Sequence, residues 1–149
     1  MIETTESVAA VLEQELIPTI LRWMKRVDKV PELTKISLSY RERTGHLPRL
    51  IEDLITRLRS RSHLDCPATT SAHDHGQMRF EQGYSVPMLV RESRLLQVSI
   101  FDTLRIRQNM LDPGNVLIDV VTIGEECDAQ LKHIVEAFRE LEQYSRRAA

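Results

Sequence analysis

The side chains that could do chemistry concentrate in one stretch, "HDHGQMRFEQGYSVPMLVRESRLL", which runs from His73 to Leu96. His75, Arg79 and Gln82 are spaced i, i+4 and i+7, so a helix would place them on one face. With a new helix N-terminus after Ser85, this face could bind an anion or a small ligand. Alternatively, its polar groups could satisfy one another in a hydrogen-bonded corner between two helices. The candidate ligand-binding or corner residues are His75, Arg79, Gln82, Tyr84, Arg91, Glu92 and Arg94.

The histidines raise the alternative of a metal site. His73 and His75 form an H-x-H pair, and His133 precedes Glu136 at i, i+3. Helical bundles bind metals through histidines and carboxylates at such spacings on facing helices. No second E-x-x-H motif completes a di-metal set. We therefore expect no metal and no cofactor, and we keep a metal- or cofactor-binding bundle that uses His73, His75 and His133 as the alternative.

A second candidate for chemistry is His46 in "RTGHLPRLIEDL", just before an amphipathic segment. Histidine phosphotransfer proteins are helical bundles. Their phospho-acceptor box has an acidic residue directly after the histidine, and a proline several residues further on. Here Leu47 follows His46 and Pro48 comes next. His46 either caps a helix or lines a turn, and phosphotransfer through His46 is a third hypothesis.

Signatures of other enzymes are absent from the sequence. No G-x-S-x-G elbow is present, and Cys127 lies on an apolar stripe, where a cysteine is usually a small buried hydrophobe. None of the glycines forms a G-x-G or a phosphate-binding loop. We expect a protein that is not an enzyme. The five glycines are Gly45, Gly76, Gly83, Gly114 and Gly124.

The composition limits the classes of protein to which this chain can belong. The 149 residues suit a single domain, 1–149, and 28% of them are charged with a net charge of −2. Because the basic residues are scattered among acidic ones, no nucleic-acid partner is expected. Two distant cysteines, Cys66 and Cys127, favour a reducing compartment. No signal peptide and no apolar run of about 20 residues is visible, so we expect a cytoplasmic protein that does not contact a membrane.

Helical periodicity organises the first half of the chain. A helix is predicted from near Thr5, capped by Thr5 or Ser7, to Val27, with a kink or break at Pro18 because proline removes a backbone donor. A second helical region covers Leu38 to Leu58. It is divided at "YRERTGHLPRL", where a glycine closes one piece and a proline opens the next. Its apolar stripe is Leu47, Leu50, Ile51, Leu54, Ile55 and Leu58.

The second half begins with a predicted loop, Ser60 to His75, with a helix starting somewhere after Pro67. A short helix through "GQMRFEQ" stops at Gly83, and Ser85 caps a long helix to about Met110. The core face of the long helix is predicted to be Leu89, Ser93, Leu96, Ile100 and Leu104.

A turn at Asp112–Asn115 precedes a last helix from about Val116 to Tyr144. Its heptad seam indicates a coiled-coil-like contact, either with a second copy of the chain or within the bundle. Together the elements predict an all-α fold, an antiparallel bundle of four to five helices. The seam residues are Val120, Gly124, Cys127, Leu131, Ile134, Phe138 and Leu141.

Two of these motifs resemble one known family. "HGQMRFEQGYSVPMLVRESRLLQ" is similar to the H-G-x-x-R-x-x-Q-G-Y-S-x-x-x-L-V-R-E-x-R-L-L pattern of the RsbRD N-terminal domain family, and "RTGHLPRLIEDLITRL" is similar to its H-L-P-x-L-L helix. The motifs occur in the family's order, and the resemblance covers Val8 to Tyr144. Ser93 departs from the pattern, which has an aromatic there. The matching polar and glycine positions are His46, His75, Arg79, Gln82, Gly83, Tyr84, Arg91, Glu92 and Arg94.

The resemblance implies an all-helical, non-catalytic input module. Such domains stand at the N-termini of RsbT co-antagonist proteins and of many bacterial sensor histidine kinases, where they are thought to sense or relay a stress signal. No established ligand or catalytic residue transfers to this chain. The expected partners are a second copy through the C-terminal helix and a signalling partner protein or a covalently linked output domain.

Overall fold

The computed structural model of the chain describes residues 4–60 and 70–149. These residues contain no β-strand, and one isolated β-bridge pairs Glu6 with Leu111. The predicted all-α class is therefore confirmed. The helices are α1 (Val8–Gln14), α2 (Leu16–Val27), α3 (Pro31–Thr34), α4 (Tyr40–Thr44), α5 (Leu47–Ser60), α6 (Thr70–Glu81), α7 (Val86–Ile106) and α8 (Pro113–Ala148).

The number of helices exceeds the four to five predicted, because breaks divide the N-terminal half into short pieces. The first break falls at Glu15 and not at Pro18, which lies in the first turn of α2. A proline ring clashes with the carbonyl four residues earlier, so the helix must stop near Gln14. The predicted cap is confirmed at Ser7, whose Oγ accepts a hydrogen bond from the Ala10 N–H at 3.1 Å.

The division of the second helical region is also confirmed. Gly45, with φ of +32°, ends α4, and Pro48 lies in the first turn of α5. All six residues of the predicted apolar stripe of α5 are buried. Part of the predicted loop, including Pro67, lies outside the described residues, whereas Thr70 to His75 already belong to α6.

The corner between α6 and α7 forms as predicted. Gly83 has φ of +88°, and its N–H donates to the Phe80 carbonyl at 3.1 Å. The Tyr84 N–H donates to the Arg79 carbonyl at 3.0 Å, which completes a Schellman motif. Ser85 follows in an extended conformation as the N-cap residue of α7, although its side chain makes no capping hydrogen bond.

The predicted ends of the last two helices need correction. The helix α7 stops at Ile106, short of Met110, and a 3₁₀ turn, η1 (Gln108–Met110), follows. The helix α8 begins at Pro113 and not at Val116, because the Asp112 carboxylate caps it by accepting the Gly114 N–H at 3.0 Å. The turn residues thus form the first turn of α8, which continues to Ala148.

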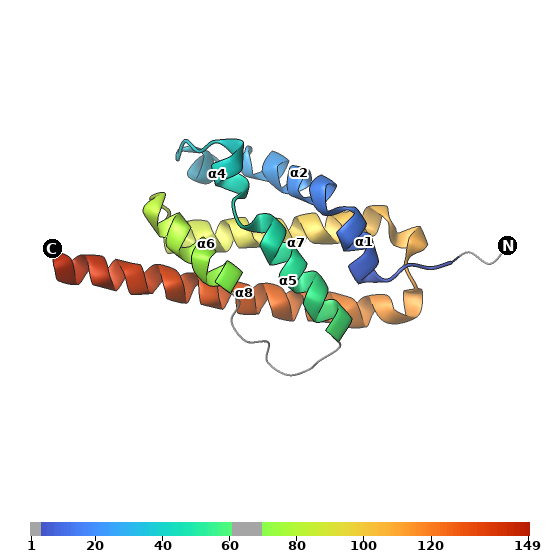
Figure 1. Cartoon of the computed structure of the whole chain (residues 1–149). Helices are drawn as coiled ribbons and strands as arrows, with labels where there is room; N and C mark the ends of the chain where they lie inside the picture. Colours follow the sequence, from blue (N-terminus) through green and yellow to red (C-terminus); the bar gives the residue numbers. More distant parts are fainter. Residues whose placement is uncertain (1–3, 61–69) are drawn as a thin grey trace.

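The two longest helices, α7 and α8, run along the length of the molecule and turn back on each other at η1 (Figure 1). The helices α1 and α2 lie above them in this view, and the C-terminal end of α8 extends beyond the other elements (Figure 1). One connected core contains Leu12, Trp23, Ile51, Leu89 and Ile123. None of the helices in the described part of the chain is long and apolar enough to cross a membrane.

The predicted heptad seam does not form the buried face of α8. Only Ile134 and Phe138 of that seam are buried. Glu126 and Gln130 take inward positions because they are partnered there: Gln130 Nε2 donates to the Leu50 carbonyl and to Glu126 Oε2, both at 2.9 Å. A prediction from hydrophobic periodicity alone leaves such polar residues out of the buried face. The buried face of α8 consists of Ile123, Glu126, Gln130, Ile134, Ala137 and Phe138.

The helices α6 and α8 approach each other closely at Gly76. A Cβ atom added to Gly76 would lie 2.3 Å from the Ile134 carbonyl oxygen and 3.0 Å from Ala137 Cβ. No side chain fits at Gly76 unless the backbone of α8 moves. The two helices are therefore in direct backbone contact at this point.

Candidate functional site

The site at the corner is centred on Glu92 of α7. Its Oε1 accepts a hydrogen bond from Arg79 Nε at 2.9 Å and lies 2.8 Å from His75 Nε2. An ionised carboxylate only accepts hydrogen bonds, so His75 donates through Nε2. The exposed fractions of the three side chains are 0% for Arg79, 3% for His75 and 5% for Glu92. The helices α6 and α7 are thus joined by a buried ionic network.

Arg79 extends this network to a third helix. Its Nη1 donates to Gln82 Oε1 at 2.6 Å and to the Glu42 carbonyl at 3.3 Å, and its Nη2 donates to the Arg43 carbonyl at 2.6 Å. The last carbonyls of a helix lack partners within the helix, and here Arg79 satisfies two of those of α4. The guanidinium also stacks over the Tyr84 ring, 4.6 Å from its centroid.

Arg43 and Tyr84 complete the network at the corner. Arg43 Nη1 donates to the Tyr84 hydroxyl at 2.7 Å, and Nη2 donates to the Ile36 carbonyl at 2.7 Å. Burial, reinforced by the charge of Glu92, raises the pKa of Tyr84 to about 12, so the phenol stays neutral. Sequence reasoning missed Arg43, because its partners are separated from it along the chain and no local pattern marks it.

The electrostatic balance keeps Glu92 charged. Burial alone would raise its pKa, but the hydrogen bond from His75 and the charge of Arg79 together hold the pKa below its ordinary value. The Trp23 indole N–H donates to the Glu92 backbone carbonyl at 3.1 Å, which ties α2 to the same point. The cavity beside Glu92 and His75 has a volume of about 20 Å³, enough for one water molecule and too small for an organic ligand.

His46 borders the network without a bond to it. Its ring meets the His75 ring edge to face, with centroids 5.9 Å apart. Partial burial, then the charges of His75 and Arg49, lower the pKa of His46. Its carbonyl accepts the Leu50 N–H at 3.0 Å, which makes it the residue that starts α5. This geometry agrees with the prediction that His46 caps a helix, and its Nδ1 is buried without a partner among the described residues.

The structure brings five of the seven predicted residues together: His75, Arg79, Gln82, Tyr84 and Glu92. Arg91 and Arg94 are exposed on α7, outside the network. Because Arg79 is fully buried and four of its five N–H groups are engaged, it is not available to an anion that arrives at the start of α7. The arrangement is that of a corner held by hydrogen bonds.

The three histidines proposed as metal ligands contact different partners and do not form one common site. His73 lies 3.9 Å from Glu140, His75 faces Glu92, and His133 lies 3.4 Å from Glu136 on its own helix. Within residues 4–60 and 70–149, no group of three or more His, Cys, Asp or Glu side chains is placed to hold a metal ion. His63 and Cys66 fall outside the described residues.

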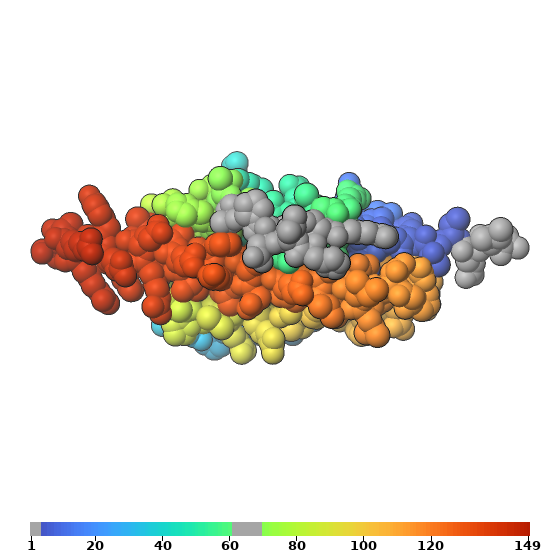
Figure 2. Space-filling model, turned by 90° about the horizontal axis from the view of Figure 1, so that it is seen from below, coloured from blue at the N-terminus to red at the C-terminus, as the bar shows by residue number. Residues whose placement is uncertain are grey.

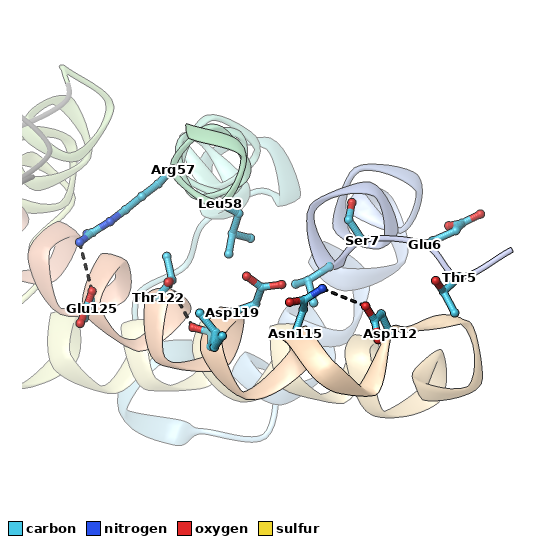
Figure 3. A pocket seen from close by; sticks show the side chains of 12 residues that line it. Thr5, Glu6, Ser7, Arg57, Leu58, Asp112, Asn115, Asp119, Thr122 and Glu125 are labelled. Atoms are coloured by element: carbon cyan, nitrogen blue, oxygen red, sulfur yellow. Dashed lines mark hydrogen bonds and ion pairs between the residues drawn. The ribbon is translucent and has the colours of Figure 1, made fainter. Parts of the chain in front are cut away.

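A larger polar cleft of about 300 Å³ lies between the N-terminal segment, α5 and α8 (Figure 3). Its carboxylates are engaged in structural contacts. Asp112 caps α8, Glu6 accepts from Gln14 at 2.9 Å, and Glu125 pairs with Arg57 at 3.4 Å. The lining of the cleft is therefore tied to structural contacts within the chain.

Comparison with known proteins adds no further constraint. No family model, no curated protein and no solved structure matches this chain.

Proposed function

We propose that this chain is a non-enzymatic helical sensory or signal-relay domain of bacterial stress-response or two-component signalling, which acts in the cytoplasm. The observation that carries the proposal is the double attachment of α6. His75 fixes α6 to Glu92 of α7 at 2.8 Å, and the adjacent Gly76 places the backbone of α6 directly against α8.

This attachment couples the corner to α8 mechanically. Packed interiors switch between discrete arrangements and do not deform continuously. A signal that displaces α6 must therefore either break the Arg79–Glu92–His75 network or carry α8 with it. A buried ion pair is well suited to such a role, because losing one partner leaves a charge without compensation.

The long helix α8 provides the output. It spans 36 residues, and from Arg139 onward it is mostly exposed and extends past α6 (Figure 1). Such a helix can pair with a second copy and pass motion to a signalling partner protein or a linked output domain. The resemblance of the His46 motif and of the His75 to Arg94 motif to RsbRD N-terminal domains supports the assignment to stress signalling.

The test compares Glu92→Gln with Arg91→Gln, a neighbouring exposed residue of the same helix. A stress-responsive transcriptional reporter in the native cell measures signalling, and hydrogen exchange of the purified protein measures the opening of α8. We expect Glu92→Gln to alter the reporter response and to speed exchange around Ile134, whereas Arg91→Gln leaves both unchanged. A folded Glu92→Gln protein with a normal reporter response would contradict the relay.

A further inference from the structure

The outer surface formed by α7 and α8 carries an open groove of about 500 Å³. Figure 2 shows α7 (yellow) along one side of α8 (orange), opposite the green helices. One wall includes Val90, Arg94 and Gln97 of α7, and the other includes Gly124, Asp128 and Leu131 of α8. Ser93 of α7 lines both this groove and the small cavity beside Glu92.

The α8 wall belongs to a heptad stripe that its own chain covers only in part. Leu117, Val121, Gly124, Asp128 and Leu131 follow one another at spacings of four, three, four and three, which is the pattern that packs against another helix. Leu117 is 78% exposed and Val121 is 60% exposed. Solvated helix faces do not usually carry apolar residues at this period.

Gly124 leaves room on the α8 wall of the groove. A Cβ atom added to Gly124 would meet only Gln97 Nε2, at 3.9 Å, so the fold of the single chain does not require glycine there. Glycine inside a helix costs about 1 kcal/mol relative to alanine. A helix that approaches from outside, however, can come close to α8 at a glycine.

We infer that this groove is the surface on which a second copy of the chain docks, in a two-fold symmetric homodimer. The charges on its walls are self-complementary: Arg94 stands on the α7 wall, and Asp128 on the α8 wall has no ion-pair partner among the described residues. Two-fold symmetry makes every contact occur twice. Arg94 therefore faces the partner's Asp128, and Asp128 faces the partner's Arg94. The inference rests on the proposed function, in which α8 pairs with a second copy.

A charge-swap experiment tests the pairing. Arg94→Asp places two acidic side chains opposite each other at both contacts, and Asp128→Arg places two basic ones there. Each variant alone should dimerise at least about tenfold more weakly than the wild type in sedimentation velocity, because like charges at an interface repel. An equimolar mixture of the two variants should form a heterodimer, since both contacts then join opposite charges. If the mixture stays monomeric while the wild type dimerises, the pairing is refuted.

A matched pair of apolar variants tests the face itself. Val121 is 60% exposed on the heptad stripe of α8, three residues before Gly124, and Ile17 is 61% exposed on α2. Val121→Asp should abolish the dimer at concentrations where the wild type is dimeric, whereas Ile17→Asp should leave it intact. Circular dichroism shows whether each variant remains folded, and their similar exposure makes a difference in folding small.

The outcomes separate this inference from the proposed function. A wild-type dimer that Ile17→Asp disrupts and Val121→Asp does not would overturn the groove as the interface and leave a dimeric relay standing. A wild-type monomer at every concentration would overturn both the groove and the dimeric form of the relay. The reporter response of Glu92→Gln tests the coupling of α6 to α8 independently of either result.

Discussion

Arg79 and Arg94 belong to the same polar stretch of sequence, yet the fold gives them opposite surroundings. Arg79 is fully buried, and it bonds to Glu92, Gln82 and two backbone carbonyls. Arg94 lies on an open groove, where its one hydrogen bond among the described residues is to Gln97 at 3.4 Å. A charged side chain with buried partners holds the corner between two helices together. A charged side chain that is exposed beside apolar residues is available to another molecule.

Two glycines show the same contrast in the backbone. The backbone of α8 leaves no room for a side chain at Gly76, whereas a Cβ atom at Gly124 would make only one ordinary contact, with Gln97 Nε2 at 3.9 Å. The first glycine is required by contacts within the chain, and the second is not. The proposed dimer would give Gly124 a role, because a second helix could approach α8 closely there.

Substituting the two arginines should give the largest difference. Arg79→Leu leaves the buried Glu92 without its main cationic partner, and we expect a loss of about 3–5 kcal/mol in the free energy of unfolding. Arg94→Leu should change it by less than about 0.5 kcal/mol, as for most surface substitutions. Urea denaturation at a protein concentration low enough to keep the chain monomeric measures both. Equal losses of stability in the two variants would contradict the conclusion that the buried contacts of Arg79 stabilise the fold more than the exposed contact of Arg94.

Substituting the two glycines with alanine should change the free energy of unfolding by smaller amounts, and the two changes should have opposite signs. Gly76→Ala forces α6 and α8 apart, and overpacking of this kind costs about 1–3 kcal/mol. Gly124→Ala should stabilise the monomer by about 0.5–1 kcal/mol, because alanine favours the helix and has room. Thermal unfolding of the two variants beside the wild type provides the measurement. A stabilised Gly76→Ala protein would contradict the close approach of the helices.

Local signals in the sequence were sufficient to predict the backbone of the corner. The ends of helices at Gly45 and Gly83 and the starts near Ser7 and Ser85 follow from the conformations and caps that single residues prefer. The i, i+4 spacing correctly placed His75 and Arg79 on one helix, whereas Gln82 lies just past its end. These features depend on neighbours in sequence, which is why they could be predicted.

Contacts between distant residues could not be predicted in the same way. Arg43 bonds to Tyr84 across 41 positions, and Gln130 bonds to the Leu50 carbonyl across 80. Gln130 in turn takes an inward position on α8, so the buried face differs from the apolar seam that a hydrophobic pattern selects. The exposure of Leu117 and Val121, and the groove at Gly124, could be identified only in the folded chain.

The smallest expected effect is on pH dependence, and it concerns the corner alone. Partial burial and the charges of His75, Arg49 and Arg79 lower the pKa of His46 from its ordinary value of 6.5, against a smaller opposing effect of Asp74. The neutral form is therefore favoured by folding. The stabilising contribution is present above pH 6.5 and is lost as the pH falls through the lowered pKa.

His46→Gln removes this contribution while keeping a polar side chain at the start of α5. We expect the free energy of unfolding of the wild type to decrease more steeply between pH 7 and pH 5 than that of the variant, as measured by urea denaturation at several pH values. The other histidines are present in both proteins, so the difference in slope reports on His46 and its interaction with His75. An identical slope in the two proteins would mean that folding does not disfavour the charged form of His46.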